Sequence, residues 1–181
     1  MNEQYVFSTP IWGYVLNNER SNIPVYINEI IRLANTTASA RKSNFGGWQS
    51  SDSLHLNSIF KPFVDTLSGL AADIVPTFTD SKHCLQSMWA NINYTNNFNA
   101  HHTHEGWISG VFYLQVPPTS GRLILTNPNI RSYNSPVKQK DFPITPEPLA
   151  CILFPSWLEH YVEPNQAEMP RISISFNIGE V

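Results

Sequence analysis

The sequence predicts a mainly β protein, a cupin-like double-sheet jelly roll with N-terminal helices packed on the outer face of one sheet. Three observations support this prediction. Only 14% of the 181 residues are charged, and 18 Asn, 18 Ser and 14 Pro supply a polarity that favours strands and turns over long helices. Two stretches with helical spacing come first along the chain. Short apolar runs broken by Pro, Asn, Ser and Gly follow them.

The length of the chain fits one domain. We therefore expect residues 1–181 to form a single unit with a helical part at about 22–75 and a β core at about 84–178. The first helix is expected over residues 22–36, where an Asn and a Pro are plausible start signals. Its apolar residues recur at helical spacing and predict one amphipathic face: Ile23, Ile27, Ile30, Ile31 and Ala34.

A second, longer helix is expected over residues 52–74, which carry a wide apolar stripe at helical spacing. Pro62 lies inside this stripe and lacks a backbone N–H, so the helix should kink there or start afresh near it. Between the helices, residues 45–52 read FGGWQSSD. We expect a loop that could reach toward a site, because Trp48 has no obvious helical or strand partner.

The β core is predicted from five short runs: LQSMWANINY, WISGVFYLQV, GRLILTN, PLACILF and RISISFNI. The last run shows two faces, because side chains alternate along a strand. Ile172, Ile174, Phe176 and Ile178 would point toward apolar neighbours, and Arg171, Ser173, Ser175 and Asn177 would point the other way. The polar face is therefore expected to line a site.

Charge and hydropathy exclude several classes of protein. The 11 basic residues are scattered among 14 acidic ones, so nucleic-acid binding is disfavoured, and no apolar run approaches the roughly 18 residues that would span a membrane. The first residues, MNEQYVFSTP, do not resemble a secretory signal or a transit peptide, so we expect a cytoplasmic protein. Cys84 and Cys151 lie in apolar runs and are expected to be buried thiols.

Histidines supply the first candidate site. The segment NAHHTHEGW holds His101, His102 and His104 just before a predicted strand. His102 and His104 are two residues apart and could meet one metal ion, whereas His101 would face away. A turn in ILFPSWLEH could bring His160 to the mouth of the barrel. Three imidazoles with open coordination positions suit a divalent ion such as Fe(II), Mn(II) or Zn(II).

Arginine and serine on the last strand supply the second candidate site. Arg171 and Ser173 share one face of the strand, and a fixed guanidinium beside a hydroxyl forms a two-point receptor for a carboxylate. The alternative is a surface arginine at a strand start, after Pro170. A buried Arg171 without a partner would be costly, so the receptor interpretation requires an anionic ligand.

The motifs HTH, SGVFYL, FPSWLEH and RISISFN, in this order, resemble those of the non-haem Fe(II)- and 2-oxoglutarate-dependent oxygenases. The sequence is most similar to a group of such oxygenases from bacteria and phages that also carry a GGWQS-like segment, here residues 46–50. The resemblance covers about residues 44–178. It implies a double-stranded β-helix, Fe(II) held by an HxD/E motif and a distal His, 2-oxoglutarate as cosubstrate, and O2 as oxidant.

For the metal, the resemblance implies His102 as the first ligand and His160 as the distal ligand. His104 stands where the common motif has an acid. HxH is typical of the narrower group, so His104 is expected to be the third ligand. Glu105 is an alternative ligand if the loop is irregular. A further alternative is an HxG-like site, in which the missing carboxylate leaves room for a halide.

For the cosubstrate, the resemblance implies that Arg171 and Ser173 form the RxS pair that binds the far carboxylate of 2-oxoglutarate. Tyr113 occupies the place where the superfamily often offers a phenol to the same carboxylate. Tyr94, at the end of the preceding strand, is a weaker candidate for that pocket.

The resemblance implies an oxidoreductase that hydroxylates an unidentified small molecule or peptide. One alternative is a non-redox metal- or carbohydrate-binding jelly roll, in which Trp48, Trp107 and Trp157 form a stacking platform. Another is a zinc hydrolase with Glu105 as base. Only the oxygenase requires the RxS receptor. The three tryptophans and the polar loop 127–145 are expected to ring the opening.

Overall fold

The computed structural model describes residues 8–129, 134 and 140–181, and within them the chain forms two antiparallel sheets and two α-helices. The larger sheet has six strands in the order β1-β9-β6-β11-β4-β3. Their bounds are β1 Trp12–Val15, β9 Ala150–Pro155, β6 Ile108–Gln115, β11 Arg171–Glu180, β4 His83–Asn93 and β3 Trp48–Gln49. The long strands β4, β6 and β11 form the middle of this sheet and carry most of its pairing.

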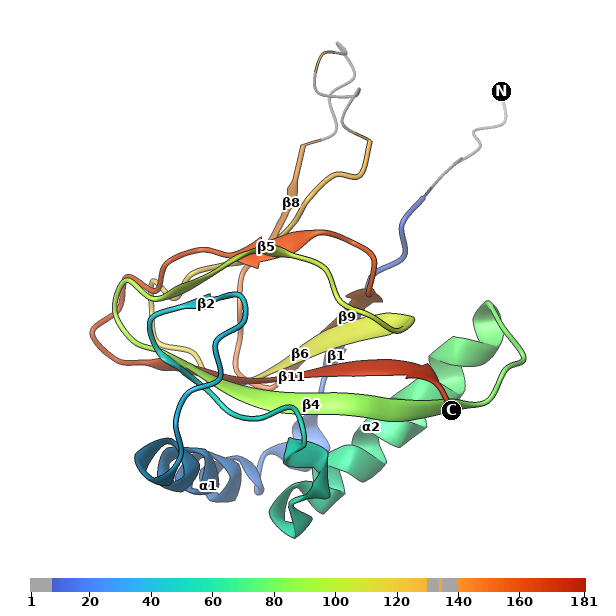
Figure 1. Ribbon diagram of the computed structural model, residues 1–181. Helices are drawn as coiled ribbons and strands as arrows, with labels where there is room; N and C mark the ends of the chain where they lie inside the picture. Colours follow the sequence, from blue (N-terminus) through green and yellow to red (C-terminus); the bar gives the residue numbers. More distant parts are fainter. Residues whose placement is uncertain (1–7, 130–133, 135–139) are drawn as a thin grey trace.

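The smaller sheet has five strands in the order β2-β5-β10-β7-β8. Their bounds are β2 Asn44–Phe45, β5 Phe98–His102, β10 His160–Val162, β7 Leu123–Leu125 and β8 Phe142–Ile144. Strands β2 and β5 lie above the larger sheet in Figure 1, and the helices lie on its other side. The two sheets with helices outside one of them confirm the predicted jelly roll.

The helices cover the outer face of the larger sheet. Helix α1 spans Ile23–Thr36 and helix α2 spans Lys61–Ile74, with 3-10 turns at η1 Asn17–Glu19, η2 Leu54–Leu56, η3 Ser58–Phe60 and η4 Val75–Thr77. The main core lies between helices and sheet: Phe63 of α2 stacks on Phe112 of β6 at 4.7 Å between ring centroids and meets Phe176 of β11 edge-on at 6.1 Å. These aromatic contacts fix helix α2 to the two central strands, β6 and β11.

The predicted second helix is partly wrong. Residues 54–60 form two 3-10 turns, and the α-helix begins only at Lys61. Pro62 stands in the first turn of α2, where its missing N–H costs no helical hydrogen bond. Of the two outcomes left open for Pro62, the fresh start is therefore the one observed. The first helix, predicted over 22–36, is confirmed at Ile23–Thr36.

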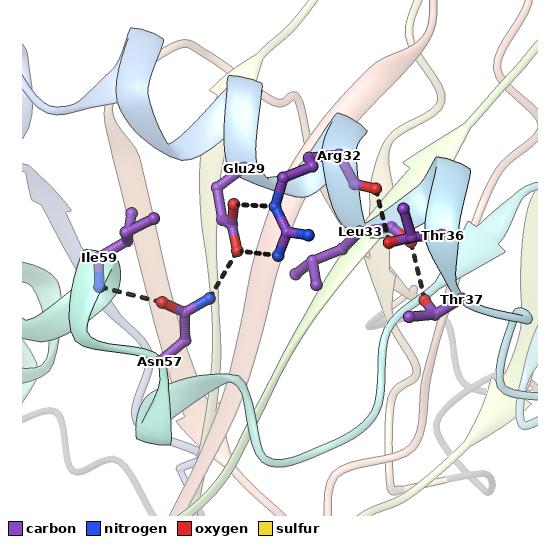
Figure 2. A network of polar contacts seen from close by, with 7 residues as sticks. All are labelled: Glu29, Arg32, Leu33, Thr36, Thr37, Asn57 and Ile59. Atoms are coloured by element: carbon purple, nitrogen blue, oxygen red, sulfur yellow. Dashed lines mark hydrogen bonds and ion pairs between the residues drawn. The ribbon is translucent and has the colours of Figure 1, made fainter.

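A polar network ties the first helix to the start of the second helical segment (Figure 2). The Glu29 carboxylate accepts two hydrogen bonds from Arg32, at 2.7 and 2.9 Å, and one from the Asn57 amide at 2.7 Å. The Asn57 side chain in turn accepts a hydrogen bond from the Ile59 N–H at 3.1 Å, capping the turn η3. Since the Glu29 side chain is 7% exposed, this network satisfies a nearly buried charge.

The segment around Trp48 is not the loop that we expected. It crosses from the smaller sheet to the larger one, with β2 and β3 joined by Gly46 and Gly47. Both glycines have positive φ, and a Cβ at Gly47 would lie 2.3 Å from the Ile92 carbonyl oxygen. Trp48 pairs with Ile92 and is buried in the main core, so it cannot line an opening.

The two faces of β11 are as predicted. Ile172, Ile174 and Phe176 are buried in the main core against the helices. Arg171 and Ser173, which alternate with them, point between the two sheets. The cysteine prediction is half right: Cys151 is buried, but Cys84 is exposed near the start of β4. Within the described ranges, neither helix is both long and apolar enough to cross a membrane.

Candidate metal centre and cosubstrate pocket

Strands of the smaller sheet bring three histidines together. His102 ends β5 and His160 begins β10, and the two residues are directly paired across the antiparallel strands. His104 lies two residues beyond β5, where its backbone N–H donates to the Ser156 carbonyl at 3.0 Å. The candidate ligand nitrogens of the three side chains all lie within 4.8 Å of one another. The predicted grouping of His102, His104 and His160 therefore forms in the fold.

Backbone carbonyls fix the orientation of two of these rings. The Nδ1 of His102 lies 2.7 Å from the Ala100 carbonyl oxygen, and the Nδ1 of His160 lies 2.9 Å from the Leu158 carbonyl oxygen. A carbonyl can only accept, so each Nδ1 carries the proton and each Nε2 keeps its lone pair. A hydrogen bond from Nδ1 to a backbone carbonyl orients the ring and directs its Nε2 toward a metal ion.

Burial keeps the three imidazoles neutral. It lowers the pKa of His102, and it lowers the pKa of His104 to about 4 and that of His160 to about 3, with smaller contributions from the neighbouring imidazoles. At neutral pH all three imidazoles are therefore in their neutral form, with one ring nitrogen unprotonated. A metal ion can take their lone pairs without first displacing a proton.

The neighbours of the triad point elsewhere. His101 faces the other side of β5, where it stacks on Tyr161 at 4.1 Å and lies 3.7 Å from the Glu159 carboxylate. Glu105 is exposed and lies on the rim of an outer cleft, outside the group of potential ligands formed by the histidines. The outward orientation predicted for His101 is thus observed, and the geometry favours His104 over Glu105.

Arg171 lines the same cavity as the triad. Among the described residues, no Asp or Glu side chain lines this cavity to balance the charge of the arginine. Arg171 is 2% exposed, its Nη1 donates to the Gly121 carbonyl at 2.7 Å, and its Nη2 donates to the Asn93 side-chain oxygen at 2.9 Å. Its Nε is fully buried and has no hydrogen-bond partner in the described part of the chain. Burial lowers the pKa of this guanidinium, because desolvation disfavours its charged form.

Ser173 and Tyr113 stand beside the arginine. They are directly opposite each other on β11 and β6, and they are 4% and 2% exposed. Burial raises the pKa of Tyr113 to about 12, against an opposing effect of the Arg171 charge. The phenol is therefore a neutral hydrogen-bond donor at physiological pH. Tyr94 does not join them: it is 50% exposed and does not line this interior.

A cavity of about 50 Å³ is shared by these groups. Its wall includes the three histidines as well as Arg171, Ser173 and Tyr113. A chelating ligand placed here would touch both sets at once. A wider cleft of about 530 Å³ adjoins it and shares Ser43, Trp89, His102 and His104 with it.

Hydrogen bonds link Arg171 to His102 through residues that the sequence analysis did not single out. Arg171 donates to the Asn93 side-chain oxygen, and the Asn93 amide donates to the Asn99 oxygen at 3.4 Å. The Asn99 amide in turn donates to the Ser43 hydroxyl at 3.2 Å. Ser43 lies 3.4 Å from Nε2 of His102. The alternation of polar residues along WANIN could have indicated this wall.

The predicted ring of tryptophans around the opening is wrong. Trp107 and Trp157 line a separate apolar hollow of about 410 Å³ together with Trp12 and Phe78. Trp48 is in the core, and the tryptophan beside the histidines is Trp89, whose ring centroid lies 5.3 Å from that of His104. Much of the loop 127–145 lies outside the described residues.

Residues 87–177, half of the chain, match the family described as "Putative 2OG-Fe(II) oxygenase". The chain belongs to this oxygenase family. Its cofactors are accordingly iron and 2-oxoglutarate, and the site fits both: three neutral imidazoles converge, and the buried Nε of Arg171 has no partner among the residues that the structure describes. A search of curated proteins finds no match.

Solved structures confirm the fold of the oxygenase. A prolyl-4-hydroxylase from Pseudomonas putida is 13% identical with a TM-score of 0.74, and the match covers 96% of this chain and 94% of that chain. The epimerase SnoN from nogalamycin biosynthesis is 14% identical with a TM-score of 0.74, over 95% and 77% of the two chains. The viral collagen prolyl hydroxylase of Paramecium bursaria Chlorella virus-1, in complex with 2OG, is 12% identical with a TM-score of 0.68, over 94% and 96%.

Proposed function

We propose that this oxygenase hydroxylates a small organic substrate at Fe(II) held by His102, His104 and His160. The observation that carries the proposal is the buried Arg171, whose Nε has no partner in the described part of the chain and which lines the same cavity as the histidines. A non-redox jelly roll or a zinc hydrolase would have no use for a carboxylate receptor at that position. An oxygenase that chelates 2-oxoglutarate requires one.

The proposed ligand set is neutral. His104 supplies the third imidazole in place of the more common carboxylate, and its ring lies 4.8 Å from that of His102 and 5.1 Å from that of His160. Since no ligand contributes a negative charge, the iron keeps its full positive charge until 2-oxoglutarate binds. Cosubstrate binding should therefore strengthen metal retention, because its carboxylate supplies the missing charge.

In the proposed pocket, Arg171 binds the far carboxylate of 2-oxoglutarate through its free Nε–H, and Ser173 and Tyr113 add hydroxyl donors. When bound, iron and 2-oxoglutarate together supply the oxidation of a C–H bond by O2. The chain itself orients the two groups and keeps water out. The apolar side chains Val111, Leu123, Phe154 and Val162 line the same cavity and serve the second task.

Hydroxylation is the reaction that we propose, since two of the three similar structures described above are prolyl hydroxylases. The test is an anaerobic titration of Fe(II) and then 2-oxoglutarate into the apoprotein, followed by the weak visible charge-transfer band of the chelate. We expect the band to appear only when both are present. Addition of O2 should then yield succinate. A parent protein that binds Fe(II) but gives neither band nor succinate would overturn the proposal.

A further inference from the structure

The outer cleft above the histidines has the size of a small-molecule site. Its volume of about 530 Å³ lies within the usual range for such sites, and His102 and His104 form part of its floor. A molecule bound in this cleft would present its C–H bonds to the proposed iron position. The substrate class inferred below therefore rests on the proposed function.

Gln49 supplies a side-chain amide that lines the cleft and could bind a ligand. Its side chain lines the cleft, is 6% exposed, and forms no hydrogen bond to any residue that the structure describes. It reaches the cleft because β3 alternates: Trp48 enters the core, and Gln49 points between the sheets opposite Asn91. Although the residue as a whole is 6% exposed, its amide atoms remain accessible from the cleft, so the amide can both donate to and accept from a bound molecule.

Trp89 supplies an apolar wall of the same cleft. It is half-buried and packs against His104 with 5.3 Å between the ring centroids. The remaining lining includes Asn177 and Ser87, which are joined by a hydrogen bond of 3.0 Å. A flat aromatic face combined with amide and hydroxyl groups suits a ligand with an apolar face and a hydroxylated edge.

The edge of the larger sheet does not offer a place for an extended peptide. A peptide would need free backbone groups on β3, the last strand of the sheet. The Gln49 N–H already donates to the Ser39 hydroxyl at 3.0 Å, and the Gln49 carbonyl accepts from the Ala40 N–H at 2.9 Å. The segment before β2 thus occupies this edge and leaves side-chain recognition of a compact molecule.

Charges on the rim argue against a phosphorylated substrate. Lys42, Asp52 and Glu105 are exposed along the cleft, so the rim carries two negative charges and one positive charge. Such a rim would repel a polyanion. It accepts a neutral or amine-bearing molecule.

We propose that the substrate is a small polyhydroxylated ring, a sugar or cyclitol, that stacks on Trp89 and exchanges hydrogen bonds with the side-chain amide of Gln49. Both residues determine specificity in this assignment. The pyranose or cyclohexane face meets the indole, and one ring hydroxyl donates to and accepts from the amide.

The test measures binding in the full chain loaded with Fe(II) and 2-oxoglutarate without O2. The probes are D-glucose, D-glucosamine and myo-inositol, with a proline-containing tripeptide and AMP as competing classes. Binding of each probe is measured by saturation-transfer NMR and by tryptophan fluorescence. We expect at least one ring compound to bind saturably. Gln49→Met should weaken that binding about five- to tenfold, and Trp89→Ala at least about tenfold. Gln166→Met, the same change at an exposed glutamine outside the cleft, should leave it unchanged.

Failure of this inference differs from failure of the proposed function. If Fe(II) and 2-oxoglutarate bind but no ring compound does, or if the tripeptide or AMP binds instead, the substrate class is wrong and the oxygenase assignment stands. The same holds if a ring compound binds equally well to the Gln49→Met variant. If Fe(II) and 2-oxoglutarate do not give their charge-transfer band, the proposed function fails.

Discussion

Replacement of Arg171 by alanine separates cosubstrate binding from metal binding. In the parent, the guanidinium is 2% exposed, two of its nitrogens are held by Gly121 and Asn93, and Nε has no hydrogen-bond partner within the described ranges. Truncation of one member of a buried charge pair costs about 2–5 kcal/mol. We therefore expect Arg171→Ala to weaken 2-oxoglutarate binding by about 30-fold to several thousand-fold, since about 1.4 kcal/mol is a factor of ten.

Metal affinity should change little in this variant. Arg171 does not contact the histidines directly in the hydrogen-bond network, because the link between Arg171 and His102 runs through three polar side chains. Calorimetric titration of Fe(II) and then 2-oxoglutarate, without O2, measures the two affinities in one preparation. Arg171→Lys should recover only part of the loss, because an ammonium offers a point charge and cannot bond Gly121 and Asn93 as the planar guanidinium does while it presents a further N–H to the carboxylate.

The control is Arg20→Ala, which removes an exposed arginine far from the cavity and should alter neither affinity. Alanine at position 171 leaves the Gly121 carbonyl and the Asn93 oxygen without their donor, so thermal unfolding must show that the variant is folded at the assay temperature. If a folded Arg171→Ala variant binds 2-oxoglutarate as tightly as the parent, the receptor assignment is refuted.

Four further predictions concern the metal site and the scaffold. His102→Ala and His160→Ala should each abolish Fe(II) binding while circular dichroism shows an intact fold; calorimetry that finds parent affinity in either would remove that ligand. His104→Asp should keep Fe(II) and His104→Ala should lose it; iron retained by the alanine variant would transfer the role to another donor. Ile174→Ala should cost about 2–5 kcal/mol in urea unfolding by leaving a core cavity, with 2-oxoglutarate affinity unchanged, because Ile174 lies on the opposite face of β11. Hydrogen bonds from Arg32 lower the pKa of Glu29 below its usual 4.5, so the ionised carboxylate stabilises the fold above about pH 4.5 and loses that contribution as the pH falls. The difference in unfolding free energy between the parent and Glu29→Gln should therefore shrink on acidification. A difference that does not depend on pH would contradict this assignment.

The sequence predicts those parts of the site that follow from strand alternation. Ile172 and Ile174 enter the core while Arg171 and Ser173 face the cavity, as a period of two requires. Tyr113 alternates in the same way with Phe112 and Leu114, which enter the core. In the structure it pairs with Ser173 on the neighbouring strand. These residues need only a correct strand and a correct face, and both can be read from local pattern.

Tertiary contacts decide the parts that the sequence does not predict. Tyr94 lies one residue beyond the last paired residue of β4, where the chain turns outward, so the alternation no longer applies to it. Residues 54–60 carry a helical apolar pattern but form two 3-10 turns, because packing overrides periodicity over so short a segment. The two-residue strand β3 gives no periodic signal of its own.

The fold fixes the Arg171 side chain before the proposed cosubstrate binds. A free arginine side chain would lose considerable rotamer freedom on binding a carboxylate, but here Gly121 and Asn93 already hold the two terminal nitrogens. Asn93 is itself held by Asn99, and Asn99 by Ser43. The guanidinium therefore loses its rotamer freedom during folding, through hydrogen bonds to residues that need not touch the cosubstrate. Binding energy from the remaining Nε–H then goes into affinity and orientation of the carboxylate, which in turn sets where the other end of the molecule meets the histidines.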